Sequence, residues 1–281
     1  MVWGLEQPLA TPETVEPAAP PILYEDAEML AVDKPAGLVV HPAYRHPDGT
    51  LYDAVRARQM ARGEGRPCLL HRLDRDTSGV VLLAKTERAR RALVRQFERR
   101  QVRKWYLALV RGQPASACGA ITQPLRRDPL DRRRVKVDGA GQTAATRYRV
   151  LAGSAERALL LAEPRTGRTH QIRAHLAWLG HPLLGDAVYG DAAAGAAPRQ
   201  MLHAWALGVR HPITGQPLRV VAPLPADFAT CLPDAWHGRC ADALDELAAA
   251  FDASDARERW PELAHQRAEQ HHEQNQTPSK E

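Results

Sequence analysis

Short apolar segments of four to six residues recur along this chain of 281 residues, and only a few longer amphipathic segments separate them. Short apolar runs between turn residues are typical of buried strands. Many short strands mixed with a few separate helices favour an α+β fold over a doubly wound parallel sheet. No apolar run approaches the ~20 residues that a membrane-spanning helix needs, so the sequence predicts no membrane segment.

The expected elements follow from these patterns. Thr86 is a predicted N-cap for a helix over 87–100, and Gly180 is the predicted C′ residue of a helix over 169–179. In the strand 105–110, alternation sends Tyr106 to the face opposite Leu107. Residues 34–37 (KPAG) supply turn chemistry between two strands within 22–40. Other strands are predicted over 80–84, 146–151, 158–162 and 218–222, a helix over 50–62, and a basic loop or hairpin tip over 125–142.

Positive charge is concentrated in one third of the chain. Residues 61–150 have a net charge of +14, against −5 for 1–60, +2 for 151–231 and −6 for 232–281. A block of this kind indicates a polyanionic partner, most often nucleic acid. A GC-rich genome also enriches arginine on solvated faces, but it would do so along the whole chain. The asymmetry therefore favours a binding face.

One candidate site is the segment 71–79, HRLDRDTSG, which precedes the apolar strand at 80–84. Asp74 lies between Arg72 and Arg75, and a carboxylate among guanidinium groups stays ionised. Such a group can act as a nucleophile or general base. The alternative is a surface aspartate in an arginine-rich loop. An aspartic protease is excluded because its signature has glycine directly after Thr or Ser and needs a second copy.

A second candidate segment, residues 165–176, carries three arginines and two histidines at the start of a predicted helix. This field suits phosphate or carboxylate partners. A zinc site made by His170, His175 and His181 is disfavoured. Their five- and six-residue gaps do not place them on one helix face, and no acidic ligand has suitable spacing.

Together these motifs resemble the signatures of the RluA family of pseudouridine synthases. The resemblance covers roughly residues 22–225, with several long motifs in the family's order. The matching segments are 22–26, 33–37, 71–79, 82–86, 104–108, 168–173, 180–182, 185–186, 202–204 and 211–212.

This resemblance implies the fold and the roles of the site residues. It implies a mixed, largely antiparallel sheet flanked by helices, and conversion of uridine in RNA to pseudouridine without cofactor or metal. Asp74 matches the catalytic aspartate, Tyr106 the tyrosine that packs on the target base, and Arg173 the basic partner of the aspartate. Arg72 matches the arginine that fills the gap left by the flipped base. Further RNA contacts are expected from Arg75, Arg132, Arg133, Arg134, Arg168 and His170.

The expected organisation is a flexible tail over 1–20, a catalytic domain over 21–230, and an acidic, partly helical extension over 231–281 that ends in a disordered tail. The tail is too short for the S4-type RNA-binding domain of many relatives, so the basic block must supply more of the affinity. No secretory signal is evident, and the four cysteines form no CxxC pair. We therefore expect a cytoplasmic protein, monomeric and without an obligate protein partner, that acts on ribosomal or transfer RNA.

Two rival functions remain at this point. One is a non-catalytic RNA-binding protein that kept the fold, although pure binding needs no buried carboxylate. The other is a hydrolase that uses Asp74 and Asp76, although two residues this close on a loop have no reason to converge on one substrate. The sequence identifies neither the RNA nor the uridine, nor whether Asp74 attacks the base or the sugar.

Overall fold

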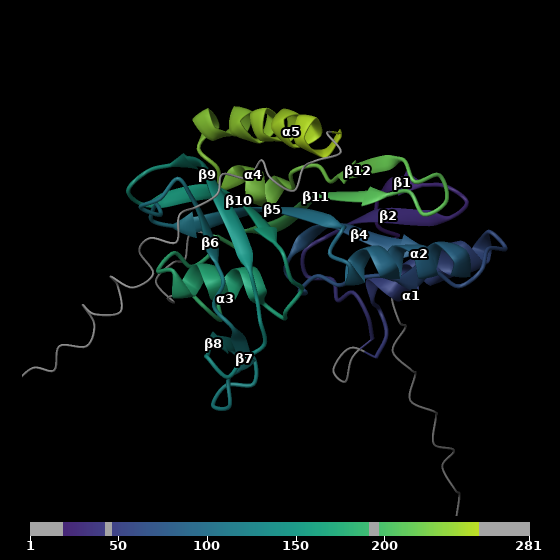
Figure 1. The fold of residues 1–281 in the computed structure, drawn as a ribbon, viewed down its shortest axis with the longest axis horizontal. Helices are drawn as coiled ribbons and strands as arrows, with labels where there is room; N and C mark the ends of the chain where they lie inside the picture. Colours follow the sequence, from purple (N-terminus) through teal and green to yellow (C-terminus); the bar gives the residue numbers. More distant parts are fainter. Residues whose placement is uncertain (1–18, 43–46, 191–196, 253–281) are drawn as a thin grey trace, which may run out of the picture.

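A single large sheet organises the chain. The computed structural model describes residues 19–42, 47–190 and 197–252 (Figure 1). Within these residues, ten strands form one sheet in the order β1-β2-β4-β11-β5-β10-β9-β6, with β12 beside β11 and β3 beside β4, and β7 and β8 form a separate hairpin. The strands are β1 (Ile22–Glu25), β2 (Met29–Lys34), β3 (Cys68–Leu69), β4 (Ser78–Ala84), β5 (Arg103–Arg111), β6 (Cys118–Ile121), β7 (Leu125–Arg127), β8 (Val135–Val137), β9 (Thr146–Gly153), β10 (Arg157–Pro164), β11 (Leu202–Arg210) and β12 (Pro217–Val221).

All neighbouring strands of the large sheet are antiparallel except β4 and β11, which run parallel. The predicted α+β class with a mixed, largely antiparallel sheet is therefore confirmed. The predicted basic tip at 125–142 is the β7–β8 hairpin, which projects away from the sheet beyond α3 (Figure 1).

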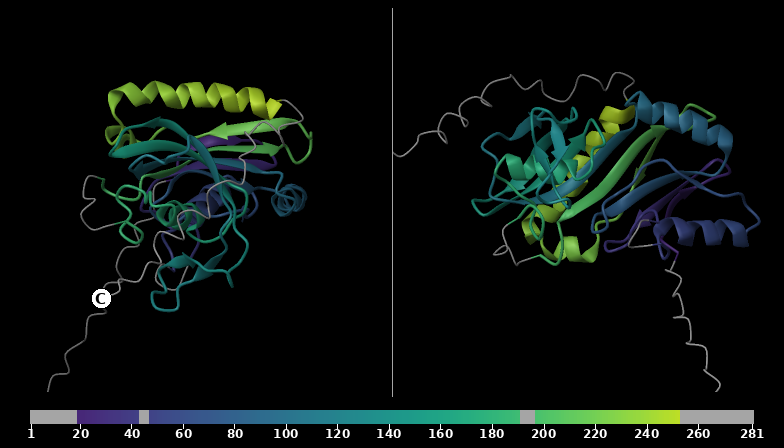
Figure 2. Two further views of the ribbon diagram at one scale, coloured as in Figure 1. Left: turned by 60° about the vertical axis from the view of Figure 1, so that its left-hand side comes forward. Right: turned by 90° about the horizontal axis from the view of Figure 1, so that it is seen from below.

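Helices cover both sides of the sheet, with α3 on one side and α4 and α5 on the other (Figure 2). Thr50 begins α1 with a capping box that includes Asp53, and the Thr86 side chain accepts a hydrogen bond from the Ala89 N–H to begin α2. The three predicted helices are present, but the one predicted over 169–179 starts later because His170 is left-handed, with φ 52°. The helices are α1 (Leu51–Ala61), α2 (Glu87–Glu98), α3 (Gln171–Trp178), α4 (Ala226–Thr230), α5 (His237–Asp252) and a 3₁₀ turn (Asp234–Trp236).

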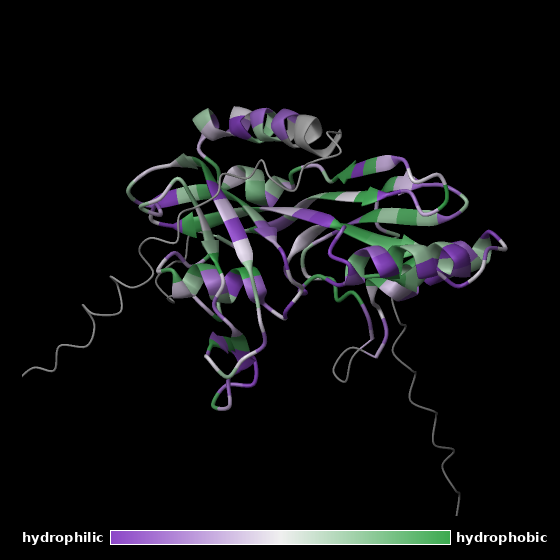
Figure 3. Cartoon of the chain, in the orientation of Figure 1, coloured by the Kyte–Doolittle hydropathy of each residue, from purple (hydrophilic) through white to green (hydrophobic). Residues whose placement is uncertain are grey.

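Alternation along the strands separates the core into layers. On β5, Tyr106 and Ala108 join a cluster with residues of α1 and α3, whereas Trp105 and Leu107 join a cluster with Phe228 of α4. The predicted opposition of the two β5 faces is confirmed. In Figure 3 the strands β2 and β4 are coloured mainly as hydrophobic, whereas hydrophobic and hydrophilic residues alternate along α2.

The parallel contact between β4 and β11 depends on a glycine. Gly79 pairs with Ala204 of β11 and has φ +113°. A Cβ atom at Gly79 would lie 2.2 Å from the carbonyl oxygen of Ala204, a distance that backbone atoms cannot tolerate. The close crossing places the loop before β4, which carries Asp74, beside the start of a central strand.

The predicted turn between the first two strands was misplaced. The chain reverses at Asp26, whose carboxylate accepts the N–H groups of Glu28 and Met29, each at 2.8 Å. Residues 34–37 instead leave the end of β2, and no strand follows directly. The side chain of Lys34 is fully buried there, and its ammonium donates to the carbonyls of Pro35, Leu38 and Arg75 at 2.7–2.8 Å.

Residues 231–252 pack on the sheet in part. Leu232 and Ala243 are buried in the cluster around Phe228. The helix α5, which begins at His237, lies in the extension that was predicted to be partly helical. Residues 1–18 of the tail predicted over 1–20 lie outside the described residues, and so do residues 253–281, which include the predicted disordered end of the extension.

Candidate active site

A cleft of about 330 Å³ lies where the loop before β4, the strand β5 and the start of α3 meet. Asp74 and five other predicted site residues line this cleft. Segments that are almost a hundred residues apart in the sequence therefore meet at one cleft. Its polar lining includes Arg72, Asp74, Lys104, Tyr106, Arg168, His170 and Arg173, and its apolar lining includes Leu70, Leu73, Phe97, Ile172 and Leu202.

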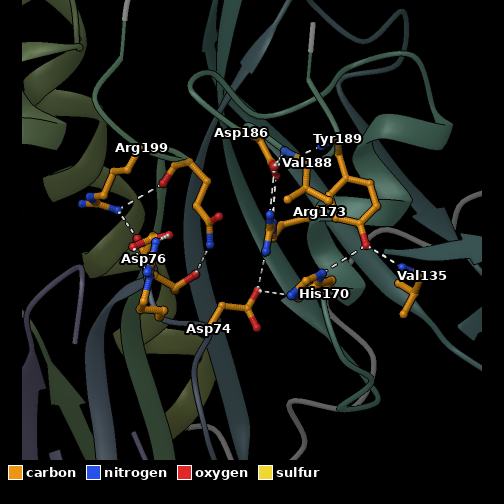
Figure 4. Close-up of polar contacts among 12 residues, drawn as sticks. Asp74, Asp76, Val135, His170, Arg173, Asp186, Val188, Tyr189 and Arg199 are labelled. Atoms are coloured by element: carbon orange, nitrogen blue, oxygen red, sulfur yellow. Dashed lines mark hydrogen bonds and ion pairs between the residues drawn. The ribbon is translucent and has the colours of Figure 1, made fainter. Parts of the chain in front are cut away.

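Asp74 presents one held and one free oxygen to this cleft. Its Oδ2 accepts a hydrogen bond from Nη1 of Arg173 at 3.1 Å and lies 3.8 Å from Nε2 of His170. No described residue donates to Oδ1 (Figure 4). The side chain is 20% exposed, so the free oxygen remains reachable from the cleft.

Backbone hydrogen bonds fix the loop that carries Asp74. The Asp74 carbonyl accepts from the Thr77 N–H at 3.1 Å, and the Arg75 carbonyl accepts from the Gly37 N–H at 3.0 Å and from the Lys34 ammonium. Burial lowers the pKa of Lys34 to about 7. The three carbonyls around its ammonium favour the charged form, and they connect the end of β2 to the Asp74 loop.

Arg173 is held from behind by a second carboxylate. Its guanidinium forms two hydrogen bonds with Asp186, at 2.8 and 2.9 Å, and is almost fully buried. Burial opposes ionisation of Asp186, but Arg173 and the N–H groups of Val188 and Tyr189 outweigh it and hold the pKa of Asp186 below its usual value. Arg173 therefore has an ionic partner that does not depend on Asp74.

Tyr189 connects this pair to the β7–β8 hairpin. Its hydroxyl accepts the Val135 N–H of β8 at 2.8 Å and lies 3.1 Å from Nδ1 of His170 (Figure 4). The guanidiniums of Arg134 and Arg173 lie 5.4 and 5.1 Å from the centre of the Tyr189 ring. Burial lowers the pKa of His170 despite the opposing charge of Asp74, so the neutral imidazole can accept from Tyr189 and turn Nε2–H toward Asp74.

Tyr106 forms another wall of the cleft. The residue is 9% exposed, and its hydroxyl makes no hydrogen bond to a described residue. Burial, together with the charge of Asp74, raises the pKa of Tyr106, so the hydroxyl keeps its proton. Lys104, two residues earlier on β5, lies on the same strand face.

Four of the predicted RNA-binding residues lie outside the cleft. Arg75 points away and pairs with Asp76 at 3.1 Å. The hairpin residues Arg132, Arg133 and Arg134 are exposed at the turn between β7 and β8, where Arg133 pairs with Asp131 at 2.8 Å.

The histidines of the disfavoured zinc site face different partners. His170 bonds Tyr189, His175 bonds Thr146 and the Gln123 carbonyl, and His181 bonds the Arg111 carbonyl. In the described part of the chain no group of three His, Cys, Asp or Glu side chains could hold a metal ion.

Lys34, Asp186 and Tyr189 were not assigned roles from the sequence. Lys34 and Asp186 fall within the quoted motifs, but their function depends on contacts across the fold. Tyr189 follows Asp186 by three residues, and that short spacing is the one available signal.

Replacing Tyr189 with phenylalanine should lower the turnover rate about tenfold and change RNA affinity little. The ring still packs under Arg173, but the Val135 N–H and His170 lose their common oxygen. Single-turnover rates and RNA affinities measure the two effects separately. A Tyr148→Phe variant, which removes a hydroxyl outside the cleft, is the control. An unchanged rate would show that the hydroxyl only stabilises the hairpin.

The sheet order and the cleft define a class of protein with known structures. The human RNA Pseudouridylate Synthase Domain Containing 1 superposes with a TM-score of 0.66 and 28% identity, covering 87% of this chain and 98% of that one. The human RNA Pseudouridylate Synthase Domain Containing 4 gives a TM-score of 0.62 and 29% identity, covering 74% and 90%. The fold is thus that of the pseudouridylate synthases.

The sequence comparisons specify the family. Residues 28–178 match the family model described as RNA pseudouridylate synthase, and the chain belongs to this family. It is 48% identical over 204 residues to an "Uncharacterized RNA pseudouridine synthase" of Chloroflexus aurantiacus, and 45% identical over 221 residues to the "Ribosomal large subunit pseudouridine synthase D" of Nitrosomonas europaea. These alignments cover 71% and 75% of this chain and 64% of each relative. The resemblance to the RluA family is confirmed.

No described helix is long and apolar enough to cross a bilayer.

Proposed function

We propose that this protein is an RNA pseudouridine synthase that isomerises uridine in structured RNA, with Asp74 as its nucleophile. The observation that carries the proposal is the Asp74 carboxylate, of which one oxygen accepts a hydrogen bond from Arg173 at 3.1 Å and the other makes no hydrogen bond to a described residue. It lies inside a cleft whose other wall includes Tyr106. The names of similar relatives favour large-subunit ribosomal RNA as the substrate over transfer RNA. An RNA substrate of this kind implies that the protein acts in the cytoplasm.

The cleft suits a reaction on a base that has left its stack. A uracil buried in a helix must be flipped out before a side chain can reach it. The Tyr106 ring offers a stacking face, and Arg72 at the cleft can fill the gap in the RNA. Stacking on an aromatic side chain contributes about 1–3 kcal/mol per base, which offsets part of the unstacking cost.

The isomerisation breaks the bond between N1 and C1′ and forms one between C5 and C1′. An ionised Asp74 can start it by attack on C1′ of the ribose or on C6 of the uracil, and it leaves when the new bond forms. The C5 proton is then lost and N1 gains one, so atoms and charge balance. Arg173 supplies the counter-charge to Asp74 in this partly closed space, where an unpaired carboxylate would be costly.

The two rival functions have less support. For a hydrolase with two carboxylates, Asp76 would have to face the substrate, but its side chain pairs with Arg75 and does not line the cleft. For a non-catalytic binding protein, the free Oδ1 of Asp74 would have no purpose, because a carboxylate repels the phosphates that such a protein binds.

Mapping pseudouridines in total RNA, with and without the gene, tests the function. We expect at least one position to lose its modification in the deletion strain and to regain it with the wild-type gene. An unchanged map, together with no activity of the purified protein on ribosomal or transfer RNA transcripts, would contradict the proposal.

RNA affinity should fall steeply with salt, and part of that dependence should come from the β7–β8 hairpin. Each phosphate contact contributes about 0.7–0.9 to the slope of log affinity against log salt. Replacing Arg132, Arg133 and Arg134 with alanine should therefore weaken RNA binding about tenfold or more. It should also reduce the steepness of the salt dependence by the amount that one or two phosphate contacts contribute. Fluorescence anisotropy across a salt series measures both.

The matched control replaces three arginines that line no part of the cleft, Arg210, Arg219 and Arg239, with alanine. Its slope should stay close to that of the wild type. An unchanged slope in the hairpin variant would show that this tip is a solvated surface turned away from RNA.

A further inference from the structure

A second cavity, of about 210 Å³, adjoins the active-site cleft. It lies between the end of α2 and the segment 163–168, which comprises the end of β10 and the residues after it. The two cavities share six lining residues, so an RNA strand that is bound in the cleft can continue directly into the second cavity. The shared residues are Phe97, Lys104, Pro164, Thr166, Gly167 and Arg168.

Three of the four cationic side chains that line this second cavity form no ion pair with a described residue. Glu163 is buried and already paired with Arg103 and Arg165. Arg168 donates through Nε to the Thr143 carbonyl, which is neutral, and Arg100 is exposed. Among the described residues neither Arg100 nor Arg168 forms an ion pair, and the remaining carboxylate of the lining, Glu98, is exposed.

Lys104 forms the wall between the two cavities. It lies on the same face of β5 as Tyr106 and reaches toward Gly167, where a Cβ atom would lie 3.9 Å from its Nζ. In the described part of the chain its ammonium has no hydrogen-bond or ion-pair partner. Burial lowers the pKa of Lys104, which shows that the charged form is poorly solvated here. A partly buried cation without a counter-charge fits an anionic ligand.

We propose that the second cavity binds the nucleotide next to the target uridine, and that Lys104 binds the backbone phosphate joining the two. The proposal rests on the proposed function, because it assumes a uridine stacked on Tyr106. Two residues of a strand span about 7 Å, which is comparable with the distance from a base to the phosphate of its own nucleotide. Arg100 and Arg168 would then lie on either side of the RNA strand where it leaves the second cavity.

The test uses the pentaribonucleotide AAUAA and two analogues, each with a neutral methylphosphonate at one of the linkages that adjoin the uridine. For the wild type, we expect one analogue to bind about tenfold more weakly, because a hydrogen bond to a charged partner is lost. The Lys104→Met variant should bind the unmodified pentamer about tenfold more weakly than the wild type does. Its affinity should not fall further when the sensitive linkage is replaced by the neutral methylphosphonate. The Lys104→Arg variant should regain most of the affinity for the unmodified pentamer, and its affinity should again fall when that linkage is neutral.

The control is Arg219→Met, on β12 and outside both cavities, which should behave like the wild type. If Lys104→Met has a lowered melting temperature, the exposed variants Arg100→Gln and Arg168→Gln provide the same comparison, with smaller losses of affinity. The proposal is overturned if neither neutral linkage weakens wild-type binding, or if Lys104→Met keeps the full sensitivity. If the linkage effect holds but no RNA is modified by the wild type, the phosphate site stands and the proposed function fails.

Discussion

Replacing Asp74 with asparagine should abolish pseudouridine formation, with a loss of more than about 10⁴-fold, while RNA affinity and melting temperature change little. Removal of a catalytic nucleophile has effects of this size in other enzymes. The amide keeps the shape of the side chain but has no nucleophilic oxygen. The rest of the site should persist, because Arg173 retains its two hydrogen bonds to Asp186. Single-turnover assays with excess enzyme measure the rate.

Asp76→Asn is the matched control for this experiment. It removes the same charge two residues away, from a side chain that pairs with Arg75 outside the cleft. We expect this variant to retain nearly all activity. Measurable turnover by an Asp74→Asn preparation whose sequence has been verified by mass spectrometry would reject Asp74 as the nucleophile.

Replacing Tyr106 with phenylalanine should slow turnover about a hundredfold or more, with RNA binding and folding preserved. The hydroxyl makes no hydrogen bond to a described residue, so it is available to the bound base. Because the pKa of Tyr106 is raised by burial and by Asp74, the hydroxyl can take up the C5 proton only if it passes on its own at the same time. Proton transfer by a positioned group contributes about 10²–10⁴-fold in enzymes.

Tyr106→Ala separates this chemical role from stacking. It should slow turnover as Phe does and also weaken RNA binding, by the 1–3 kcal/mol that a base stacked on an aromatic ring contributes. Both variants are compared in single-turnover rates and in equilibrium affinities. A Phe variant that turns over like the wild type would restrict Tyr106 to a stacking surface.

Local patterns predicted much of the fold. Hydrophobic periodicity and capping residues located α1, α2 and most of the long strands, because these signals act within a few residues. The first turn was misplaced because two mechanisms competed: Asp26 closes the hairpin through its side chain, whereas the residues at 34–37 serve to bury Lys34. The strands β3, with two residues, and β11, of which only residues 202–204 were assigned to a motif, were not predicted, because neither has a periodic signal that distinguishes it.

The candidate site could be anticipated where a motif carries its own chemistry. Asp74, Tyr106 and Arg173 were selected from separate segments, and the structure brings them to one cleft, although their roles stay predictions. Lys34 and Tyr189 could not be selected, because their contacts join segments 41 and 54 residues apart in sequence. Arg75, which was expected to contact RNA, lies outside the cleft because its side chain pairs with Asp76, and its role also stays a prediction.

The position of β11 has a consequence for the order of assembly during synthesis. β11 lies between β4 and β5, and its His203 pairs with Ser78, 125 residues earlier. Before residues 202–210 are made, β4 and β5 each lack the neighbour that joins β1–β2–β4 to the remaining strands, and each presents an open edge. Closing so long a loop is entropically unfavourable and slow, as in other folds of high contact order. The cleft, which spans this junction and includes Leu202 in its lining, is therefore expected to be among the last parts of the molecule to form, only after residues 202–210 have been translated.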